Sequence, residues 1–415
     1  MAVRRYLPME SRPYRFNNHF KLLLSGDDFL TSVLAGIESA RHRILFEMYL
    51  VEPGHSFELL WQKFCEAANR GVSVFILLDD FGSRLVLPRC IQLSQAHPTM
   101  YLSVYNPVSW CLMSANFNRD HRKLIVIDDS TAWLGGFGIC DNFYDKVIAR
   151  TDYREPVWMD VGVRVRGLVV RDWVRLFFGT WHSVRSKLVD SLITVQTARS
   201  EERTISSFSL LGDDSFVRNT QPSGQHTDYS CIGRMAYGAQ RHRQDIVREF
   251  IKRIRTARQR VWLTSPYFVT TRQIRRALRR ASQRGVDVKV IVPGPYMDHP
   301  SIRYAGRRHY GELIAAGVKI FEYQRSFLHA KCYLCDEWIS MGSFNLDHWT
   351  YRWNLEANQE IVCDTILRKM LVVYAQLIAA SEQVTPGQMK RVSLKVRILV
   401  FILGKIEELV LRFVR

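Results

Sequence analysis

The sequence predicts an α/β fold made of two related halves in one chain, with mixed sheets flanked by helices. Segments typical of a strand, an amphipathic helix and a second strand occur in that order twice along the 415 residues. Each set is followed by the same short polar motif. Strand–helix–strand units give a sheet that helices cover on both faces. The length also favours two domains over one.

An internal repeat relates the two halves. The first copy reads RHRILFEMYL (41–50), FELLWQKFCEAANRGVSVFILLDD (57–80) and DHRKLIVIDDSTAWLGGFG (120–138). The second copy reads RQRVWLTSPYF (258–268), IRRALRRASQRGVDVKVIVPG (274–294) and LHAKCYLCDEWISMGSFN (328–345). Gly71 and Gly285 follow the helical stretches, as expected of the left-handed residue that ends a helix. The apolar, β-branched runs after these glycines predict buried parallel strands.

Composition indicates where the halves divide. Residues 197–225 are rich in Ser, Thr, Asp, Gly and Arg, which is typical of a linker or a surface excursion. We expect a first domain at 1–200 and a second at 226–385. A C-terminal amphipathic helix is expected at 386–415.

The charge balance points to an anionic partner. The chain has 58 Lys and Arg against 40 Asp and Glu, a net charge of +18. Nucleic acid, an acidic membrane surface or a phosphorylated substrate would each suit this excess, and charge alone does not choose among them. The 47% hydrophobic content excludes disorder of the whole chain.

The eight cysteines are scattered, mostly within apolar runs, which favours reduced thiols in a reducing compartment. Cys332 and Cys335 have the spacing of half a zinc site, but the sequence holds no second pair with ligand spacing. We therefore interpret them as strand residues. The N-terminus has no apolar signal segment, and no stretch reaches the roughly 20 uncharged apolar residues of a spanning helix. We expect a protein that stays on the cytoplasmic side.

A duplicated motif, His-x-Lys-x4-Asp, carries the chemistry. Its members are His121, Lys123 and Asp128, and then His329, Lys331 and Asp336. Residues two apart in a strand share a face, so each imidazole would emerge beside an ammonium group. Two lysines can stabilise the extra charge of a phosphodiester transition state. One histidine can attack phosphorus, while the other protonates the leaving alkoxide and deprotonates the incoming hydroxyl. This chemistry needs no metal and no cofactor, and we expect none.

With this motif the sequence resembles the phospholipase D superfamily, from about residue 16 to 380. Within it, the chain is similar to short bacterial cardiolipin synthases that lack N-terminal transmembrane helices. The stretches behind this closer resemblance are RILFEMYL, RGVSVFILLDDFGS, DHRKLIVID, GVKIFEY and SFNLDHWTYRWNLEAN. The resemblance implies a bilobal fold in which both motifs meet at one site on a pseudo-twofold axis. It favours His121 as the nucleophile and His329 as the acid and base.

The resemblance also implies orienting carboxylates. Glu356 matches the acid that hydrogen-bonds His329, and Asp160 is expected to do the same for His121. An acid on the far nitrogen fixes the tautomer of an imidazole and supports its cation. Glu47, on an expected core strand, matches an acid that faces the active site.

Small and polar residues after each motif are expected to approach the phosphate. Ser343 and Asn345 follow Gly342 in the second half. The first half departs from the family pattern, because Gly138 occupies the place of the asparagine that would bind phosphate. This departure puts a symmetric phosphate clamp in doubt.

The resemblance implies a phosphatidyltransferase that makes cardiolipin from phosphatidylglycerol, with phosphatidylglycerol or phosphatidylethanolamine as donor. Three alternatives stay open: a phospholipase D that forms phosphatidic acid, a nucleic-acid phosphodiesterase, and a non-catalytic lipid-binding scaffold. Intact histidines and lysines in both motifs argue against a scaffold.

The C-terminal segment favours lipid over nucleic acid. Residues 390–415 would form a helix with a broad apolar face rimmed by Lys and Arg, which suits a bilayer interface. Packing of this helix on the protein itself is the alternative. Residues 110–113, WCLM, are a second candidate lipid contact. We expect anionic phospholipid and a membrane surface as partners, no nucleic acid, and a peripheral location on the cytoplasmic face of the inner membrane.

Overall fold

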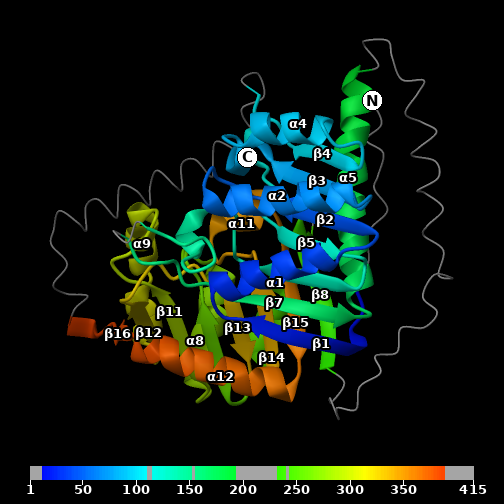
Figure 1. Ribbon diagram of the computed structural model, residues 1–415. Coiled ribbons are helices and arrows are strands. Elements are labelled where there is room, and N and C mark those ends of the chain that lie inside the picture. The colour runs from blue at the N-terminus through cyan, green and yellow to red at the C-terminus, as the bar shows by residue number, and fades with distance from the viewer. Residues whose placement is uncertain (1–11, 110–114, 152–154, 193–230, 240–242, 388–415) are drawn as a thin grey trace.

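The structure is a computed structural model that describes residues 12–109, 115–151, 155–192, 231–239 and 243–387. Its strands form one 16-stranded sheet in the order β16-β12-β11-β10-β13-β14-β15-β8-β1-β7-β6-β5-β2-β3-β4, with β9 paired to β8. In Figure 1 most of the first half, blue to green, lies above most of the second half, yellow to red. The expected mixed α/β fold is confirmed, but the two half-sheets join edge to edge.

The first half contains seven strands and the helices between them. Its elements are β1 (Arg15–Leu23), α1 (Gly26–Ser39), β2 (Arg43–Met48), α2 (His55–Asn69), β3 (Ser73–Asp79), α3 (Asp80–Ser83), α4 (Leu87–Gln95), β4 (Met100–Tyr105), η1 (Ala115–Phe117), β5 (Lys123–Ile127), β6 (Thr131–Gly135), η2 (Asp141–Phe143), β7 (Gly162–Gly167) and α5 (Val170–Leu192).

The second half repeats this order and adds a short edge strand. Its elements are β8 (Cys231–Ala239), β9 (Arg243–Gln244), α7 (Asp245–Thr256), β10 (Arg260–Thr264), α8 (Arg272–Gln283), β11 (Asp287–Pro293), α9 (Pro300–Arg307), α10 (Tyr310–Ile314), β12 (Lys319–Tyr323), β13 (Cys332–Cys335), β14 (Trp338–Gly342), α11 (His348–Trp353), β15 (Leu355–Val362), α12 (Asp364–Ala379) and β16 (Ser381–Gln383).

The two half-sheets have the same strand order. From its outer edge to the junction the first half runs β4-β3-β2-β5-β6-β7-β1, and the second runs β12-β11-β10-β13-β14-β15-β8. β2, β3 and β4 are parallel, as are β10, β11 and β12, whereas the remaining neighbours on this path are antiparallel. The antiparallel pair β1 and β8 joins the halves.

The sequence located the repeated helices and strands correctly. α2 ends at Asn69 and α8 ends at Gln283, and the glycine two residues beyond each end has a positive φ, 86° at Gly71 and 89° at Gly285. Glycine adopts this backbone region without the steric cost that other residues meet. The chain then enters β3 and β11, the predicted buried parallel strands.

Helices cover both faces of the sheet. One face carries α5 and α12 over a single apolar cluster that includes Trp173 and Met370 and spans both halves. The opposite face carries two clusters, one with Phe29 and Trp61 from α1 and α2, and one with Phe250 and Leu278 from α7 and α8. A sheet buried on both faces explains the continuous apolar runs of its parallel strands.

One cysteine prediction was wrong and another is confirmed. Cys231 and Cys363 form a disulfide with a Cα–Cα distance of 4.9 Å. The antiparallel register of β8 and β15 pairs Ile232 with Val362 and therefore sets the two flanking cysteines opposite each other. Cys332 and Cys335 are buried at the two ends of β13, as predicted.

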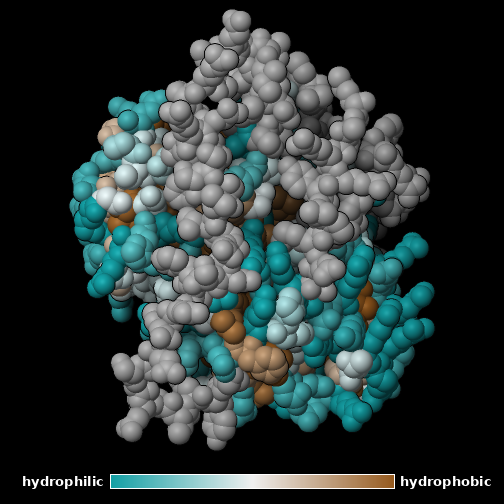
Figure 2. Space-filling model, turned by 90° about the vertical axis from the view of Figure 1, so that its right-hand side faces the viewer, coloured by the Kyte–Doolittle hydropathy of each residue, from teal (hydrophilic) through white to brown (hydrophobic). Residues whose placement is uncertain are grey.

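Three sequence predictions fall outside the described residues: the linker at 197–225, the apolar stretch at 110–113 and the amphipathic helix at 390–415. No helix within the described ranges combines the length and apolar character that crossing a membrane requires. The described surface visible in Figure 2 is mainly hydrophilic, with small hydrophobic patches.

Candidate active site

Short backbone bridges seat the start of each motif strand against the other half. The His121 N–H donates to the Leu355 carbonyl oxygen at 3.0 Å, and the Leu355 N–H donates to Arg119 at 2.8 Å. The second motif repeats the exchange, since the His329 N–H donates to Met159 at 2.8 Å and the Met159 N–H donates to Phe327 at 2.8 Å. Each histidine therefore lies beside the residue that precedes a carboxylate of the opposite half.

The carboxylates are exchanged between the halves. Glu356 lies 2.9 Å from Nδ1 of His121, and Asp160 lies 2.6 Å from Nδ1 of His329. The sequence prediction had the right residues but the wrong pairs, because it assigned Glu356 to His329 and Asp160 to His121. The bridges give the reason: they align each motif with a strand of the other half. The contact of Glu356 with Nδ1 leaves Nε2 of His121 for chemistry.

Each motif lysine donates a hydrogen bond to the backbone of the histidine two residues before it. The Lys123 ammonium donates to the His121 carbonyl oxygen at 2.8 Å, and Lys331 donates to that of His329 at 2.7 Å. Lys331 also lies 3.1 Å from both ring nitrogens of His329. The sharing of a face within each His-x-Lys pair, expected from strand geometry, is therefore present.

Burial and the two lysines lower the pKa values of the groups at the site. Burial and the charge of Lys331 lower the pKa of His329 to about 4, and burial also lowers the pKa of His121. Burial and the charge of Lys331 lower the pKa of Lys123 to about 7. The charges of the two lysines act on each other's half, so the two motifs form one site. A bound phosphate anion would raise these pKa values again.

The motif aspartates, counted among the catalytic residues from the sequence, contact the backbone of the neighbouring strand and not the imidazoles. Asp336 accepts hydrogen bonds from the backbone N–H groups of Arg258, Gln259 and Arg260, at 2.9 to 3.0 Å. Asp128 does the same for residues 41–43, at 2.8 to 3.0 Å. Both aspartates follow their strand with a positive φ, which directs the carboxylate to the entry of the neighbouring strand. They clamp two strands together.

Asn345 and Ser343 lie near the site with different tasks. Both are buried. The Ser343 hydroxyl accepts from the Ala357 N–H at 3.1 Å, so it supports the strand that carries Glu356. The Asn345 side-chain oxygen has no hydrogen-bond partner within the described part of the chain. A buried amide oxygen without a donor is the kind of group that an N–H or O–H of a ligand satisfies.

The first half replaces this pair by glycines for a steric reason. A Cβ at Gly136 would lie 2.2 Å from the Asp160 carboxylate, and a Cβ at Gly138 would lie 3.0 Å from Leu50. In the first half the Val161 N–H donates to the Asp160 carboxylate at 2.7 Å. In the second half the corresponding N–H, of Ala357, donates to the Ser343 hydroxyl. The clamp suggested by the family pattern is therefore asymmetric.

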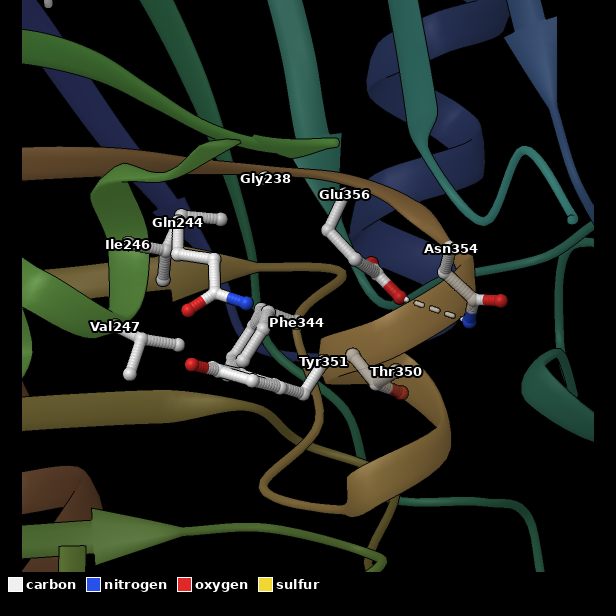
Figure 3. Close-up of a pocket in the computed structure, with 9 residues that line it drawn as sticks. All are labelled: Gly238, Gln244, Ile246, Val247, Phe344, Thr350, Tyr351, Asn354 and Glu356. Atoms are coloured by element: carbon white, nitrogen blue, oxygen red, sulfur yellow. Dashed lines mark hydrogen bonds between the residues drawn. The ribbon is translucent and has the colours of Figure 1, made fainter. Parts of the chain in front are cut away.

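A small pocket opens beside Glu356, as Figure 3 shows. Gly238, Gln244, Ile246, Val247, Phe344, Thr350, Tyr351, Asn354 and Glu356 line it. The Asn354 side-chain amide donates to Glu356 at 3.1 Å, which helps to hold the carboxylate toward His121. Sequence reasoning missed Asn354. The signal was its spacing, because a residue two positions before Glu356 shares a strand face with it.

A comparison with protein families decides the relationship of the chain. Residues 33–145 and 250–378 match the family described as cardiolipin synthase, PLD-like domain. The chain belongs to this family. The two matched segments include both motif histidines and Glu356, so the PLD-like unit is duplicated and the chain is an enzyme of the phospholipase D superfamily.

Curated relatives of this PLD-like chain are named cardiolipin synthases. The chain is 28% identical over 375 residues to that of Alkalihalophilus pseudofirmus, which covers 90% of this chain and 68% of the relative. It is 29% identical over 358 residues to cardiolipin synthase A of Pseudomonas entomophila, with 86% and 67% covered. For the enzyme of a Geobacillus species the identity is 29% over 350 residues, with 83% and 63% covered. The chain thus spans about two thirds of the length of these relatives.

Solved structures share the fold. A phosphatidylserine synthase from Haemophilus influenzae superposes with a TM-score of 0.65 at 13% identity, over 96% of this chain and 95% of that one. A polyphosphate kinase from Porphyromonas gingivalis gives 0.51 at 13% identity, over 86% and 46%. At this identity the likeness concerns the fold alone.

Behind the first motif, this PLD-like chain holds a buried ionic cluster that sequence reasoning missed. Arg122 lies 2.8 Å from Asp120 and 2.8 Å from Glu47, and it donates to Thr180 of α5 at 2.9 Å. Burial raises the pKa of Glu47 well above its usual value, although the charge of Arg122 opposes this. Glu47 therefore faces α5 and not the imidazoles, contrary to its predicted place. Alternation along the strand puts Arg122 on the face opposite His121.

The second motif lacks such charges and is enclosed by aromatic rings. The His329 ring lies 5.3 Å from Phe143, 5.7 Å from Trp158 and 5.6 Å from Phe327, measured between ring centroids. The ring of His121 has Tyr49 at 4.8 Å. The repeat is thus close in backbone and different in its surroundings. The sequence already contains this difference, because Asp120 and Arg122 flank the first histidine whereas Leu328 and Ala330 flank the second.

Proposed function

We propose that this chain is a phosphatidyltransferase that makes cardiolipin from phosphatidylglycerol through a phosphohistidine intermediate. The observation that carries the proposal is the crossed pair of imidazoles, each oriented by a carboxylate of the other half and each beside a lysine. The names of the curated relatives supply the substrate class. Phosphatidylethanolamine is a second candidate donor.

The reaction proceeds in two displacements at phosphorus. Nε2 of His121 attacks phosphatidylglycerol, and the P–N bond forms as the P–O bond to glycerol breaks. His329, protonated once the phosphate anion is bound, gives its proton to the departing glycerol oxygen. His329 then takes the proton from the terminal hydroxyl of a second phosphatidylglycerol, whose oxygen displaces His121 and completes cardiolipin. Glu356 supports the positive charge on His121 while the P–N bond exists.

The surroundings of the two rings support His121 as the nucleophile. The Lys331 ammonium lies 3.1 Å from both ring nitrogens of His329, whereas Lys123 contacts the carbonyl oxygen of His121. An ammonium group beside the ring nitrogens of an imidazole opposes attack of that imidazole on phosphorus. His329 could attack only after Lys331 moves away. Among the residues that the structure describes, no ammonium group is placed against Nε2 of His121.

The enzyme would work at the membrane surface, on the cytoplasmic face of the inner membrane. Its substrates are lipids, and residues 390–415 carry the pattern of an interfacial helix. The excess of positive charge would add attraction to anionic lipid.

The test is incubation of the purified protein with phosphatidylglycerol vesicles without divalent metal, followed by mass spectrometry of the lipids. Cardiolipin with matching glycerol release is the expected result. Phosphatidic acid alone would assign hydrolysis instead, and no lipid change, with phosphatidylethanolamine added as well, would overturn the lipid substrate. His121→Ala and His329→Ala should each abolish turnover while circular dichroism shows an intact fold. Wild-type rates in either variant would exclude the two-histidine mechanism.

A further inference from the structure

A cationic cluster that the two displacements do not use lies beside the active site. It gathers residues from the start of α8, from the α9–α10 turn and from α11, and its members are Arg272, Arg275, Arg308, His309 and His348. The charges of Arg275 and Arg308 lower the pKa of both His309 and His348, after the larger effect of burial. The start of α8 and the α9–α10 turn therefore bring guanidinium groups to one place, and α11 adds an imidazole.

Part of this cluster is already neutralised and part is not. The Glu312 carboxylate lies 2.5 Å from Arg275 and neutralises its charge, and it lies 3.6 Å from the His309 ring. Neither Arg272 nor Arg308 forms an ion pair with a carboxylate among the residues that the structure describes. Both side chains are exposed. The outer rim of the cluster therefore keeps two guanidinium groups that an anion can reach.

The cluster is connected to the active site by a short stretch of backbone. Asn345 belongs to the site, and His348 follows three residues later, which limits their separation to at most about 11 Å. A bridge between Val269 and Asp347 fixes this stretch against the chain that leads into α8. Figure 3 shows Thr350 and Tyr351 of α11 beside the pocket at Glu356. The bridge therefore holds the start of α8 and the start of α11 beside the segment that carries Asn345.

A second buried polar group at this place has no partner. The Thr270 hydroxyl is 1% exposed and has no hydrogen-bond partner within the described ranges. The backbone oxygen of the same residue accepts from Arg275. An unsatisfied buried hydroxyl next to a cationic rim adds a donor for an anionic oxygen.

We propose that Arg272, Arg308 and His348 form a second phosphate site, which binds the phosphate of the acceptor phospholipid. This inference rests on the proposed transferase function. A phosphatidylglycerol acceptor carries its own phosphate three carbons from the hydroxyl that attacks. When that hydroxyl lies at His329, the acceptor phosphate must lie a few ångströms from the first one, where it needs cations of its own. Water and simple alcohols have no such phosphate and gain nothing from the cluster.

The test is a competition between two acceptors for one covalent intermediate. Phosphatidylglycerol vesicles are supplied with a fixed concentration of n-propanol, and mass spectrometry gives the ratio of cardiolipin to phosphatidylpropanol. Donor binding and the first displacement are common to both products and cancel in this ratio. The double variant Arg272→Gln/Arg308→Gln should lower the ratio about tenfold or more, because charge-assisted contacts to phosphate are lost. Arg272→Lys/Arg308→Lys should restore most of it.

A matched control removes the same charge elsewhere. Arg255 and Arg280 are exposed in the last turns of α7 and α8. Hydrogen bonds from Arg284 to the carbonyl oxygens of Ile254 and Ala257 join these two helix ends, so both arginines lie at the end of α8 away from Arg272. The double variant Arg255→Gln/Arg280→Gln should keep the wild-type ratio, which separates a local phosphate site from general attraction to anionic lipid. If the first double variant makes neither product, its two single variants supply the ratio.

The outcomes separate the subsite from the function. An unchanged ratio in Arg272→Gln/Arg308→Gln overturns the second phosphate site and leaves the transferase standing. An equal fall in the control variant also overturns it, since membrane attraction then explains the effect. A wild-type protein that makes neither cardiolipin nor phosphatidylpropanol overturns the proposed function itself.

Discussion

At the scale of single residues, the exchange of carboxylates is the feature that the sequence did not predict. Both acids were found from their motifs, but their partners were reversed, because sequence order cannot tell which half contributes the neighbouring strand. His121 and Glu356 are 235 positions apart, and they meet only through the bridge at Leu355. The motif aspartates, counted among the catalytic residues from the sequence, hold neighbouring strands together instead. A positive φ after a strand turns such a side chain toward the backbone.

The crossed pairing predicts a specific titration. Glu356→Gln removes the negative charge beside His121, so the pKa of His121 should fall while that of His329 stays unchanged. Asp160→Asn should lower the pKa of His329 and leave His121 alone. NMR titration of the two imidazoles, assigned with single His→Gln variants, measures both. A fall at His329 in Glu356→Gln would restore the uncrossed arrangement.

The clamp at Asp336 predicts a loss of stability without a loss of chemistry. Burial opposes ionisation, but three backbone N–H groups lower the pKa of Asp336 below its usual value. Asp336→Asn keeps the positive φ and should lower the free energy of unfolding by about 1 kcal/mol, since solvent screens this partly exposed group. Turnover per folded molecule should stay at the wild-type level.

The pH dependence of this effect has a definite sign. The contribution of Asp336 is fully present above the unfolded-state pKa of about 3.9 and is lost as the pH falls through the lower folded-state value. Urea unfolding of wild type and variant should therefore differ at neutral pH and converge in acid. Asp364→Asn is the control, because its exposed ion pair with Arg368 contributes little. A constant difference down to low pH would contradict the assignment.

At the scale of elements, the two ends of the long connection between β6 and β7 support the second histidine. Gly136 leaves room for the Asp160 carboxylate, which a Cβ would approach to 2.2 Å. Gly136→Ala should displace Asp160 and lower kcat about a hundredfold, the usual cost of a small misplacement near reacting groups. Steady-state kinetics with detergent-solubilised phosphatidylglycerol measures this.

A glycine with open space around its Cβ position provides the control for Gly136. A Cβ at Gly179, inside α5, would have nothing within 4 Å. Gly179→Ala should therefore keep kcat and stabilise the protein by about 0.5–1 kcal/mol. Equal activity in the two alanine variants would show that Gly136 does not protect Asp160.

The elements themselves were largely predictable, whereas their surroundings were not. Apolar periodicity and the glycines after α2 and α8 located the repeated helices and parallel strands. Periodicity along one chain says which face a residue occupies, but not what lies across from it. Arg122 and Glu47 face each other beneath α5 through pairings of β2 and β5 that no local pattern encodes.

At the scale of the whole molecule, the two halves form one sheet and one site, and a membrane contact is proposed for the tail. Removal of residues 390–415 should reduce binding to phosphatidylglycerol vesicles more than it reduces turnover on detergent-solubilised substrate, because only the first assay needs a bilayer interface. Vesicle co-sedimentation and lipid mass spectrometry measure the two quantities. Equal losses in both would indicate that the tail packs on the protein. We also propose that the first domain ends near residue 200 and that the second begins near residue 226.

The bridges at Leu355 and Met159 have a consequence for inheritance. Since each histidine takes its acid from the opposite copy, a duplicated unit of this kind works only as a pair, and fusion into one gene fixes that pair at one to one. Fusion also frees the copies to drift apart in sequence. The copies differ at the site itself, where Gly136 and Gly138 stand at the places of Ser343 and Asn345. A substitution near the carboxylate of one copy therefore affects the histidine of the other copy.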